Sequence, residues 1–499
     1  MGGADGAWSE LTRHFGDIEL LENARAVLAW DQQTYLPARG AEARGAQLAH
    51  LTGLSHRATI DPRVRTWLDT LEATPLDPIR AGGVRNLRRT VDRAVRVPTE
   101  LVERFAALQS EAFGAWVQAK QADRWDLFAP VLERVVEVSL ERAAAIDSAG
   151  HPYDAVLQEF DPGTTVSSLR GVFGRLQQGL GGLLEAIAAR PPIRARPLSL
   201  AEAHQVALHR EVTAALGYDY TAGRLDFAEH PFTVSLGTGD VRITTHLHEG
   251  DLLGGLSGSI HEAGHGMYEQ GLPRDKVGWG MEGAASMGLH ESQSRFWENW
   301  VGRSRPFLDW LGGRLAAVAP ELGADTRWLY AEANRVTPGL IRIHADEVTY
   351  NLHIIIRFEL ELALFERQLR VADLPEAWRE KYREHLGVVP ETFREGVLQD
   401  VHWSGGAFGY FPSYTLGNLY AASLARALEG AVPDLWSEVA EGRFGGILAW
   451  LRQNIHQHGH VWDAPELVRR AVGERDSVSD LLDHLWSRHG ALYGAVRPV

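Results

Sequence analysis

Apolar residues recur at helical spacing along most of the chain. The pattern is clearest in residues 101–149 and 350–369, where apolar positions three and four residues apart form one continuous face. Strand-like alternation is scarce and is concentrated in residues 233–247. The sequence therefore predicts a mainly α-helical fold with one small β-sheet.

The small sheet is predicted to be a β-hairpin followed by a helix. Two β-prone runs, residues 233–236 and 241–247, flank a Gly-Thr-Gly-Asp turn. A helix is expected to begin near Ser257 or Ser259, because a serine hydroxyl can cap the first amides of a helix. Gly271, with a proline two residues later, is expected to be its C-cap.

This helix carries a His-Glu-x-x-His pattern, formed by His261, Glu262 and His265. On a helix, two histidines four residues apart share one face and can bind one zinc ion, and the glutamate beside them can activate water. Taken singly, each residue is more often an ordinary packed or exposed side chain. Together, in the first turns of a capped helix, they predict a zinc site.

Catalytic zinc usually has three protein ligands and one open position for water, so a third ligand is needed. The extended motif with a third histidine is excluded, because Tyr268 and Gly271 stand at its glycine and histidine positions. A carboxylate from a second helix is the remaining common solution. The candidates near in sequence are Glu269, Glu282, Glu291 and Glu298.

Glu291 is the candidate that the sequence favours. Glu269 shares the helix face of His265, and one straight helix cannot easily surround an ion with three side chains. Glu282 lies in a Gly-rich stretch that is typical of a loop. Glu291 follows Gly288 in a segment with helical periodicity, which a tight return could place against the zinc helix.

The length of 499 residues alone suggests about three domains. No Ser/Gly linker, low-complexity tract or internal repeat marks a boundary, and the Pro-rich stretch 190–197 is predicted to be a stiff loop between helices. We therefore expect residues 1–499 to form a single domain.

Net charge and composition exclude several classes of partner. A net charge of −15 argues against a nucleic-acid partner. No run approaches about 18 apolar residues, and residues 1–10 lack the basic start and apolar segment of a signal peptide. The absence of cysteine is compatible with a reducing compartment, so a cytoplasmic location is expected.

Arg342 is a candidate for substrate recognition. An enzyme that trims C-termini must bind a free α-carboxylate, and the planar guanidinium group can bind both of its oxygens. Asp346 lies four residues after Arg342, however, and a helix salt bridge between them is the simpler interpretation. From position alone, the salt bridge is favoured.

Two further polar clusters have open interpretations. Asp400 and His402 precede an aromatic, Gly-rich stretch, residues 404–414, which is typical of a functional loop. If buried, this pair could orient a zinc ligand or stabilise the fold. Three alternating histidines, His456, His458 and His460, are expected to be structural or exposed rather than a second metal site.

Several of these segments form an ordered set of motifs. In sequence order they are His230-Pro-Phe232, the Asp-x-Arg-x-Thr of Asp240, Arg242 and Thr244, the motif of residues 261–265, His290-Glu-Ser-Gln293, Ile341-Arg-Ile-His-Ala-Asp346 and Gly396-Val-Leu-Gln-Asp-Val-His-Trp403. Together they resemble the M32 family of metallocarboxypeptidases, the thermostable carboxypeptidase Taq type. The resemblance extends from about residue 20 to 460 and is far more specific than one zinc motif.

The resemblance implies a fold and a set of site residues. The fold would be one peptidase domain, with N-terminal and C-terminal helical lobes around a deep groove, that forms a homodimer. Glu291 would be the third metal ligand, and Arg342, with His230 nearby, would anchor the substrate carboxylate. The remaining assignments are a wall at the end of the groove formed by Asp240, Arg242 and Thr244, substrate contacts from Asp400 and His402, and an oxyanion donor at Tyr414.

The resulting hypothesis is a zinc metallocarboxypeptidase acting on peptides with a free C-terminus. The ion would lower the pKa of its bound water to about 7, and Glu262 would transfer the proton to the leaving amino acid. A His₂Glu site also accepts Co²⁺ or Mn²⁺. The alternatives are a zinc endo- or oligopeptidase and a non-enzymatic peptide-binding protein, and the intact ligand set argues against the latter.

Overall fold

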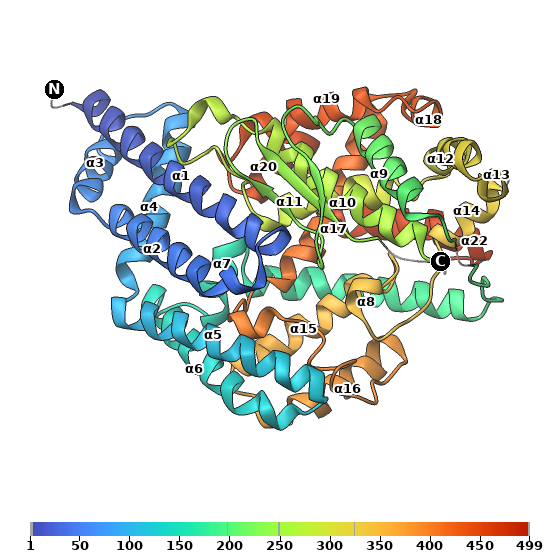
Figure 1. The fold of residues 1–499 in the computed structure, drawn as a ribbon, viewed down its shortest axis with the longest axis horizontal. Helices are drawn as coiled ribbons and strands as arrows, with labels where there is room; N and C mark the ends of the chain where they lie inside the picture. Colours follow the sequence, from blue (N-terminus) through green and yellow to red (C-terminus); the bar gives the residue numbers. More distant parts are fainter. Residues whose placement is uncertain (1–2, 197, 248–249, 324, 498–499) are drawn as a thin grey trace. The chain divides into compact units, whose positions relative to one another are not determined.

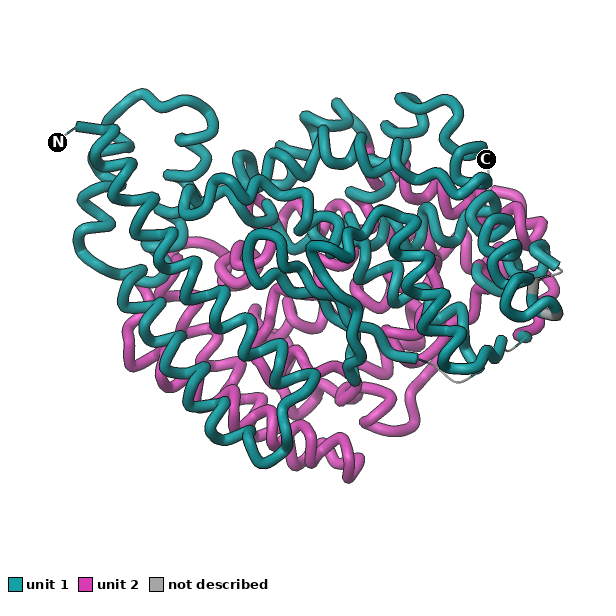
Figure 2. The backbone as a smooth tube through the Cα atoms, turned by 45° about the horizontal axis from the view of Figure 1, so that its top comes forward, with its two compact units in different colours: residues 1–95, 196–333, 420–475 teal, residues 96–195, 334–419, 476–499 magenta. Residues whose placement is uncertain are grey.

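The computed structural model describes residues 3–196, 198–247, 250–323 and 325–497. Helices dominate these residues, and the described strands form one small sheet, which confirms the expected mainly α-helical class (Figure 1). The chain folds into two compact units, each made of three separate stretches (Figure 2). Unit 1 comprises Met1–Val95, Arg196–Ala333 and Tyr420–Arg475, and unit 2 comprises Arg96–Ala195, Asn334–Leu419 and Asp476–Val499.

The bounds of the main elements follow the chain through both units. In unit 1 they are α1 (Ala4–Thr34), α2 (Ala41–Thr59), α3 (Pro62–Glu72), α4 (Pro78–Arg96), α9 (Glu202–Leu216), β1 (Leu225–Phe227), β2 (Thr233–Ser235), β3 (Val241–Thr245), α10 (Leu252–Gly271), α11 (Met287–Arg295), the π-helix η4 (Phe296–Val301), α12 (Arg305–Val318), α13 (Pro320–Gly323), α14 (Thr326–Ala333), α18 (Leu435–Ala440), α19 (Gly445–Asn454) and α20 (Ala464–Val472). In unit 2 they are α5 (Thr99–Ala122), α6 (Ala129–Ile146), α7 (Pro152–Phe160), α8 (Val166–Ala188), α15 (Tyr350–Phe365), α16 (Leu374–Leu386), α21 (Ser477–Leu485), the π-helix η9 (Trp486–Gly490) and α22 (Ala491–Tyr493), while α17 (Phe411–Ala431) has residues in both.

Several predictions from periodicity are confirmed. The apolar patterns of residues 101–149 and 350–369 correspond to α5, α6 and α15. Residues 190–196 form the expected non-helical connection between α8 and α9, and Pro197 lies outside the described residues. The single-domain assignment with two lobes and a groove stays a prediction.

The sheet has the strand order β1-β3-β2 and packs beside α10. β2 and β3 are antiparallel, with Val234 opposite Arg242, which confirms the predicted hairpin. β1 pairs in parallel with β3, and Leu225 lies opposite Ile243. The sequence analysis missed β1, because three residues are too few to show a period.

The start of α10 differs from the expectation. The helix begins at Leu252, where the Asp251 carboxylate accepts a hydrogen bond of 3.0 Å from Gly254 N, so the predicted serine cap was wrong. Ser259 instead lies inside the helix and bonds Thr245 Oγ1 at 2.6 Å. The zinc-motif histidines consequently lie in the middle of α10 and not in its first turns. Capping favours aspartate at least as much as serine, and the sequence allowed either.

The end of α10 also differs by one residue. Gly271 is the last helical residue, and Leu272 occupies the C-cap position. A Cβ at Gly271 would lie 2.5 Å from Nδ1 of His456. The glycine is therefore needed for a close side-chain contact and not for a left-handed cap.

Close packing places α11 directly against α10. Ser286 caps α11 by accepting a hydrogen bond of 2.9 Å from Leu289 N. Gly264 of α10 faces α11, and a Cβ there would lie 2.7 Å from the Gln293 carbonyl oxygen and 2.7 Å from Ser294 Cα. Both neighbours are backbone atoms, so only glycine permits this approach.

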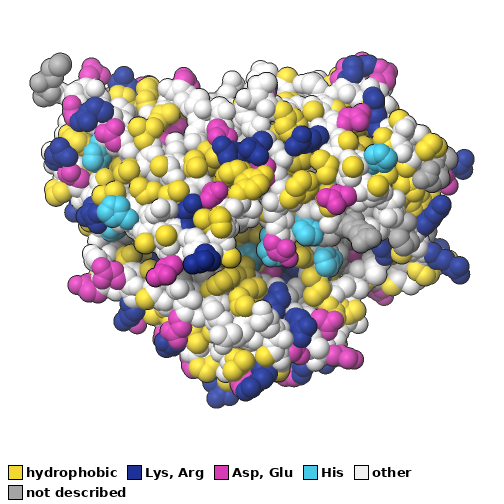
Figure 3. Space-filling model, in the orientation of Figure 1, with side chains coloured by type: hydrophobic (Ala, Val, Ile, Leu, Met, Phe, Trp, Pro, Cys, Tyr) yellow, Lys and Arg dark blue, Asp and Glu magenta, His cyan; other side chains and the backbone are white. Residues whose placement is uncertain are grey.

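Surface charge is mixed by sign. On the face drawn in Figure 3, acidic and basic side chains are interspersed, without an extended basic area of the kind that binds nucleic acid. The exclusion of a nucleic-acid partner stays a prediction. Among the described helices, none has the length and apolar character needed to span a bilayer.

A buried carboxylate joins three segments of unit 2. Glu361 of α15 accepts hydrogen bonds from Tyr153 Oη at 2.6 Å, Trp403 Nε1 at 2.7 Å and Gly409 N at 3.0 Å. Burial is the largest influence and raises the pKa of Glu361 to about 7, although the three donors lower it. The folded state therefore favours the protonated carboxyl more than the unfolded state does.

The contact at Gly264 predicts the effect of adding one methyl group. Gly264→Ala forces α10 and α11 apart and should lower the free energy of unfolding by about 1–3 kcal/mol, measured by denaturant unfolding. Gly258→Ala, on the same helix with nothing within 4 Å of the new Cβ, is the control. It should be neutral or stabilise by up to about 1 kcal/mol. Equal effects of the two substitutions would contradict the packing argument.

Glu361 predicts a component of stability that depends on pH. Because its folded pKa lies above its unfolded value of 4.5, its contribution is complete below pH 4.5 and is lost as pH rises through about 7. The difference in unfolding free energy between wild type and Glu361→Gln should change by roughly 3 kcal/mol over that interval. Glu376→Gln, an exposed position on α16, should leave the wild-type pH curve unchanged. An unchanged pH slope in Glu361→Gln would remove Glu361 as the cause.

Candidate metal centre

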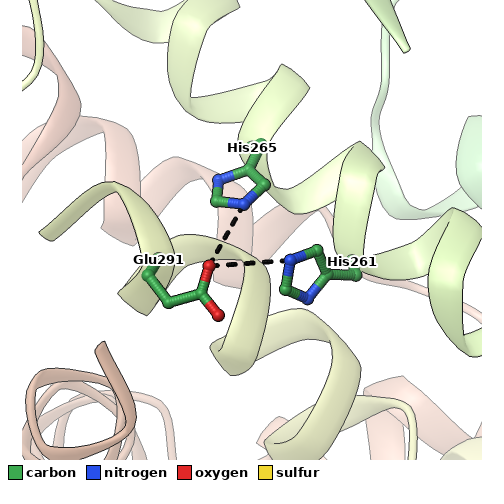
Figure 4. A group of neighbouring side chains, drawn as sticks. All are labelled: His261, His265 and Glu291. Atoms are coloured by element: carbon green, nitrogen blue, oxygen red, sulfur yellow. Dashed lines mark ion pairs between the residues drawn. The ribbon is translucent and has the colours of Figure 1, made fainter. Parts of the chain in front are cut away.

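Three side chains of unit 1 converge in the arrangement of a metal site (Figure 4). Nε2 of His265 lies 3.3 Å from Glu291 Oε2, and Nε2 of His261 lies 3.6 Å from the same oxygen. The three ligand atoms all lie within 4.8 Å of one another. Two ligands bound to a tetrahedral zinc ion at about 2.0–2.1 Å are roughly 3.4 Å apart, so these residues fit such an ion.

The electrostatic state of the group also suits a cation. Burial by itself would raise the pKa of Glu291, but Arg295, with Nε 2.7 Å from Oε1, and the two histidines hold it well below its ordinary value. Burial lowers the pKa of His265 to about 3, so its ring is neutral. An anionic carboxylate and a neutral imidazole are the forms that bind metals.

Glu262 lies beside the group and is not one of its members. Its side chain is buried, and Oε2 accepts a hydrogen bond of 2.7 Å from Thr233 Oγ1 of β2. Burial is the largest influence on the pKa of Glu262 and raises it above the ordinary value. A carboxylate with a raised pKa, held by one hydroxyl, is suited to exchanging a proton near neutral pH.

The other glutamates considered as third ligands occupy different positions. Glu298 Oε2 lies 2.8 Å from the outer nitrogen of His261, Nδ1. Glu269 Oε1 lies 2.9 Å from His290 Nε2. Glu282 lies in a non-helical segment, as expected, where it accepts hydrogen bonds from Gly278 N and Met281 N. Of the four, Glu291 is the one that the structure brings together with both histidines.

The hairpin of unit 1 holds the next group of expected site residues. Thr244 Oγ1 accepts a hydrogen bond of 2.8 Å from Phe232 N and donates one of 3.1 Å to Phe232 O, which fastens the exposed His230 segment to β3. Arg242 Nη2 lies 2.8 Å from Asp240 Oδ2. Its guanidinium Cζ lies 4.2 Å from the ring centroid of Trp30 at the end of α1. These motifs therefore form one assembly around β3.

Arg342 of unit 2 does not form the helix salt bridge that its position favoured. It opens the short 3₁₀-helix η5 (Arg342–His344), and its Nη2 lies 2.9 Å from Asp400 Oδ1. Asp346 instead accepts hydrogen bonds from Thr337 N and Thr349 Oγ1, at 3.0 and 2.8 Å. The four-residue spacing predicted a contact only if the segment were α-helical, which it is not.

Asp400 lies between two buried guanidinium groups. Arg357 Nη2 lies 2.6 Å from Asp400 Oδ2, opposite the oxygen that faces Arg342. Although burial opposes its ionisation, both guanidinium groups hold the pKa of Asp400 far below its ordinary range. The two arginines and one carboxylate leave this buried cluster with one excess positive charge.

His402 and Tyr414 complete the unit 2 cluster. Burial lowers the pKa of His402 to about 4, so the ring is neutral. Its Nε2 lies 3.2 Å from Tyr414 Oη, and the Tyr414 ring centroid lies 4.9 Å from Arg342 Cζ. Arg342, Asp400, His402 and Tyr414 are thus brought together within unit 2.

The alternating histidines have separate surroundings, as expected. His456 Nε2 lies 3.0 Å from Gln293 Oε1, and His460 Nε2 lies 3.3 Å from Asp463 Oδ1. The ring of His458 contacts that of Trp462. None of the three belongs to a metal-binding group among the described residues.

The sequence analysis missed Thr233 and Arg357 as site components. Thr233 was placed in the hairpin, but no spacing rule connects it with a residue 29 positions later. Arg357 is fully buried in α15, where its sequence neighbours indicate only a hydrophobic helix. Buried charges are paired, so an arginine inside an apolar run was the available signal.

Comparisons with known proteins agree on one family. The family model of the carboxypeptidase Taq (M32) metallopeptidases matches residues 10–489. Thermostable carboxypeptidase 1 of Thermus thermophilus is 43% identical over 509 aligned residues, covering 98% of this chain and 99% of the relative. Carboxypeptidase 1 of Bacillus subtilis is 35% identical, covering 95% and 96%.

Solved structures give the same result. The crystal structure of an M32 carboxypeptidase from Deinococcus radiodurans R1 has a TM-score of 0.95 and 37% identity, covering 98% of this chain and all of that one. A carboxypeptidase structure from Pyrococcus furiosus has a TM-score of 0.94 and 31% identity, covering 97% and 99%. Because the family model and these relatives match almost from end to end, the chain belongs to the M32 family of metallocarboxypeptidases.

Proposed function

We propose that this protein is a zinc-dependent carboxypeptidase that removes C-terminal amino acids from peptides. The observation that carries the proposal is the convergence of His261 Nε2, His265 Nε2 and Glu291 Oε2, with Glu262 next to them. Two histidines and one glutamate are a common ligand set of zinc peptidases, and they leave an open position. Co²⁺ and Mn²⁺ suit the same donors.

When bound, the ion supplies Lewis-acid chemistry, which acidifies water and polarises the carbonyl oxygen of the scissile bond. Glu262 takes the proton from the attacking water and then gives it to the nitrogen of the leaving amino acid. Thr233 holds the Glu262 carboxylate in position, and burial keeps its proton affinity high. Tyr414 Oη donates to the developing oxyanion.

Selection of the C-terminus is assigned to the cluster around Arg342. The excess positive charge of Arg342, Arg357 and Asp400 is complementary to one substrate carboxylate. Asp400 fixes the Arg342 guanidinium through Nε and Nη2, which directs the remaining donors. His402 holds Tyr414.

The assembly around β3 is assigned to the end of the substrate site. His230 contributes to binding of the C-terminal residue, and Asp240, Arg242 and Thr244 form a wall that stops the chain. The ion pair of Asp240 with Arg242 and the stacking of Arg242 on Trp30 support a rigid wall. We further propose that the protein is a cytoplasmic homodimer, on the basis of the family resemblance.

Glu262→Gln tests the proton-transfer role. Losing the only proposed general base should reduce kcat by about 10²–10⁴-fold, because general acid–base catalysis contributes that much. Metal content, measured by elemental analysis, should stay at the wild-type level, and a chelator should abolish the wild-type activity reversibly. Near wild-type turnover in Glu262→Gln would remove Glu262 from this role.

Arg342→Ala tests the anchoring role. The substitution should raise KM for free-acid peptides by about 10–100-fold, as expected for loss of a hydrogen bond to a charged group. Arg370→Ala, an exposed arginine of unit 2, should behave as wild type. Product analysis by mass spectrometry, on matched free-acid and amidated peptides, distinguishes this enzyme from an endo- or oligopeptidase. Internal cleavage of amidated peptides, unaffected by Arg342→Ala, would overturn the carboxypeptidase assignment.

A further inference from the structure

Each of the two histidines proposed as metal ligands makes a second contact behind its ring. Nε2 of both rings points to Glu291, and Nδ1 of both points away from it. A ligand imidazole is oriented by the hydrogen bond that its outer nitrogen makes. The partners of the two outer nitrogens differ, which gives the site an asymmetric support.

His261 is supported directly by a carboxylate. Its Nδ1 lies 2.8 Å from Glu298 Oε2, and the other oxygen of Glu298 accepts a hydrogen bond of 3.0 Å from Ser257 Oγ. Two guanidinium groups, of Arg295 and Arg303, lie 3.1 and 3.5 Å from the same carboxylate. Glu298 is therefore buried, ionised and held at both oxygens.

Glu298 lies in the π-helix η4, which continues α11 directly after the helix segment that carries Glu291. The wider turn of a π-helix changes the direction of its side chains relative to an α-helix, and such turns are frequent at functional sites. One continuous helical segment thus presents one glutamate to the inner nitrogen of His261 and another to the outer nitrogen.

His265 is supported through a relay of two residues. Its Nδ1 lies 2.6 Å from His290 Nδ1, and His290 Nε2 lies 2.9 Å from Glu269 Oε1. The second oxygen of Glu269 pairs with Arg274. The rings of His265 and His290 are also close, with centroids 4.4 Å apart.

Hydrogen positions in this relay follow from the metal-binding role. If His265 offers the Nε2 lone pair to an ion, its hydrogen is on Nδ1, and it donates to His290 Nδ1. His290 then carries its own hydrogen on Nε2 and donates to Glu269. Each donor in the relay meets an acceptor, so the order His265, His290, Glu269 has one consistent assignment.

We propose that Glu298 and the pair His290 and Glu269 are positioning residues that set the affinity of this site for its metal ion. They fix the tautomer and ring orientation of His261 and His265. This inference rests on the proposed metal-binding function of His261, His265 and Glu291. It gives a role to Glu269, which shares the α10 face of His265 and lies behind the site rather than at the ion.

The direct test is the metal affinity of the purified metal-free protein. Competition with a chromogenic chelator gives Kd for Zn²⁺, and the visible absorption of added Co²⁺ reports the coordination geometry. Glu298→Gln and His290→Phe should each weaken Zn²⁺ binding by about 10–100-fold, the usual cost of losing a ligand's outer partner. Both should also change the Co²⁺ spectrum.

Asp226→Asn provides a matched control. Asp226 is a buried carboxylate of unit 1, paired with an arginine, and it contacts Arg224 and Tyr35 rather than a ligand histidine. Its substitution should leave Kd and the Co²⁺ spectrum unchanged. Wild-type affinity and spectrum in Glu298→Gln and His290→Phe would overturn the inference.

A double-substitution cycle tests the relay itself. Glu269→Gln keeps an acceptor for His290 and should weaken Zn²⁺ binding less than His290→Phe does. Since Glu269 acts through His290, adding Glu269→Gln to His290→Phe should cause no further loss. Additive losses would show that Glu269 acts independently and would overturn the relay.

Stability controls separate positioning from folding and from the metal site itself. Unfolding midpoints of the metal-free variants identify any general loss of structure, and Ser257→Ala is the milder alternative if Glu298→Gln does not fold. It removes one support of Glu298 and should weaken binding several-fold, and unchanged binding would count against Glu298. His265→Ala should abolish stoichiometric binding, and if it does not, the proposed metal site fails rather than its supports.

Discussion

The contact between α10 and α11 is the constraint on which the metal centre depends. Gly264 lets the backbone of α11 approach α10 so closely that a Cβ would lie 2.7 Å from the Gln293 carbonyl oxygen. This contact places Glu291 within 3.3 Å of His265 Nε2 and aligns η4 so that Glu298 reaches His261 from behind. A glycine in the middle of a helix costs about 1 kcal/mol, and here that cost permits the convergence of ligands from two helices.

Buried charge in both units is balanced locally. At the metal centre, Arg295 contacts both Glu291 and Glu298, so two carboxylates remain ionised without water. In unit 2, Asp400 divides its oxygens between Arg342 and Arg357 and leaves one positive charge uncompensated. A buried cluster with one excess charge is complementary to a ligand of opposite charge, which is why Arg342 suits a carboxylate better than a fully paired arginine would.

The helices and the hairpin were predictable because their signals are local. Apolar spacing identified α5, α6 and α15, and the Gly-rich turn identified the hairpin. The start of α10 was misplaced because several residues in front of it can cap a helix, and only packing selects Asp251. The pairing of Arg342 was misjudged for a related reason: the salt-bridge rule applies to α-helix, and the segment forms a 3₁₀ turn.

The sequence by itself determined the mainly helical class, the His-Glu-x-x-His helix and, through six ordered motifs, membership of the M32 family. It named Glu291 as the favoured partner of the two histidines. Only the tertiary structure decided what lies behind the ligands, with Glu298 at one histidine and His290 with Glu269 at the other. The physical reason is range: periodicity and capping depend on residues a few positions apart, whereas these contacts depend on how closely separate helices pack.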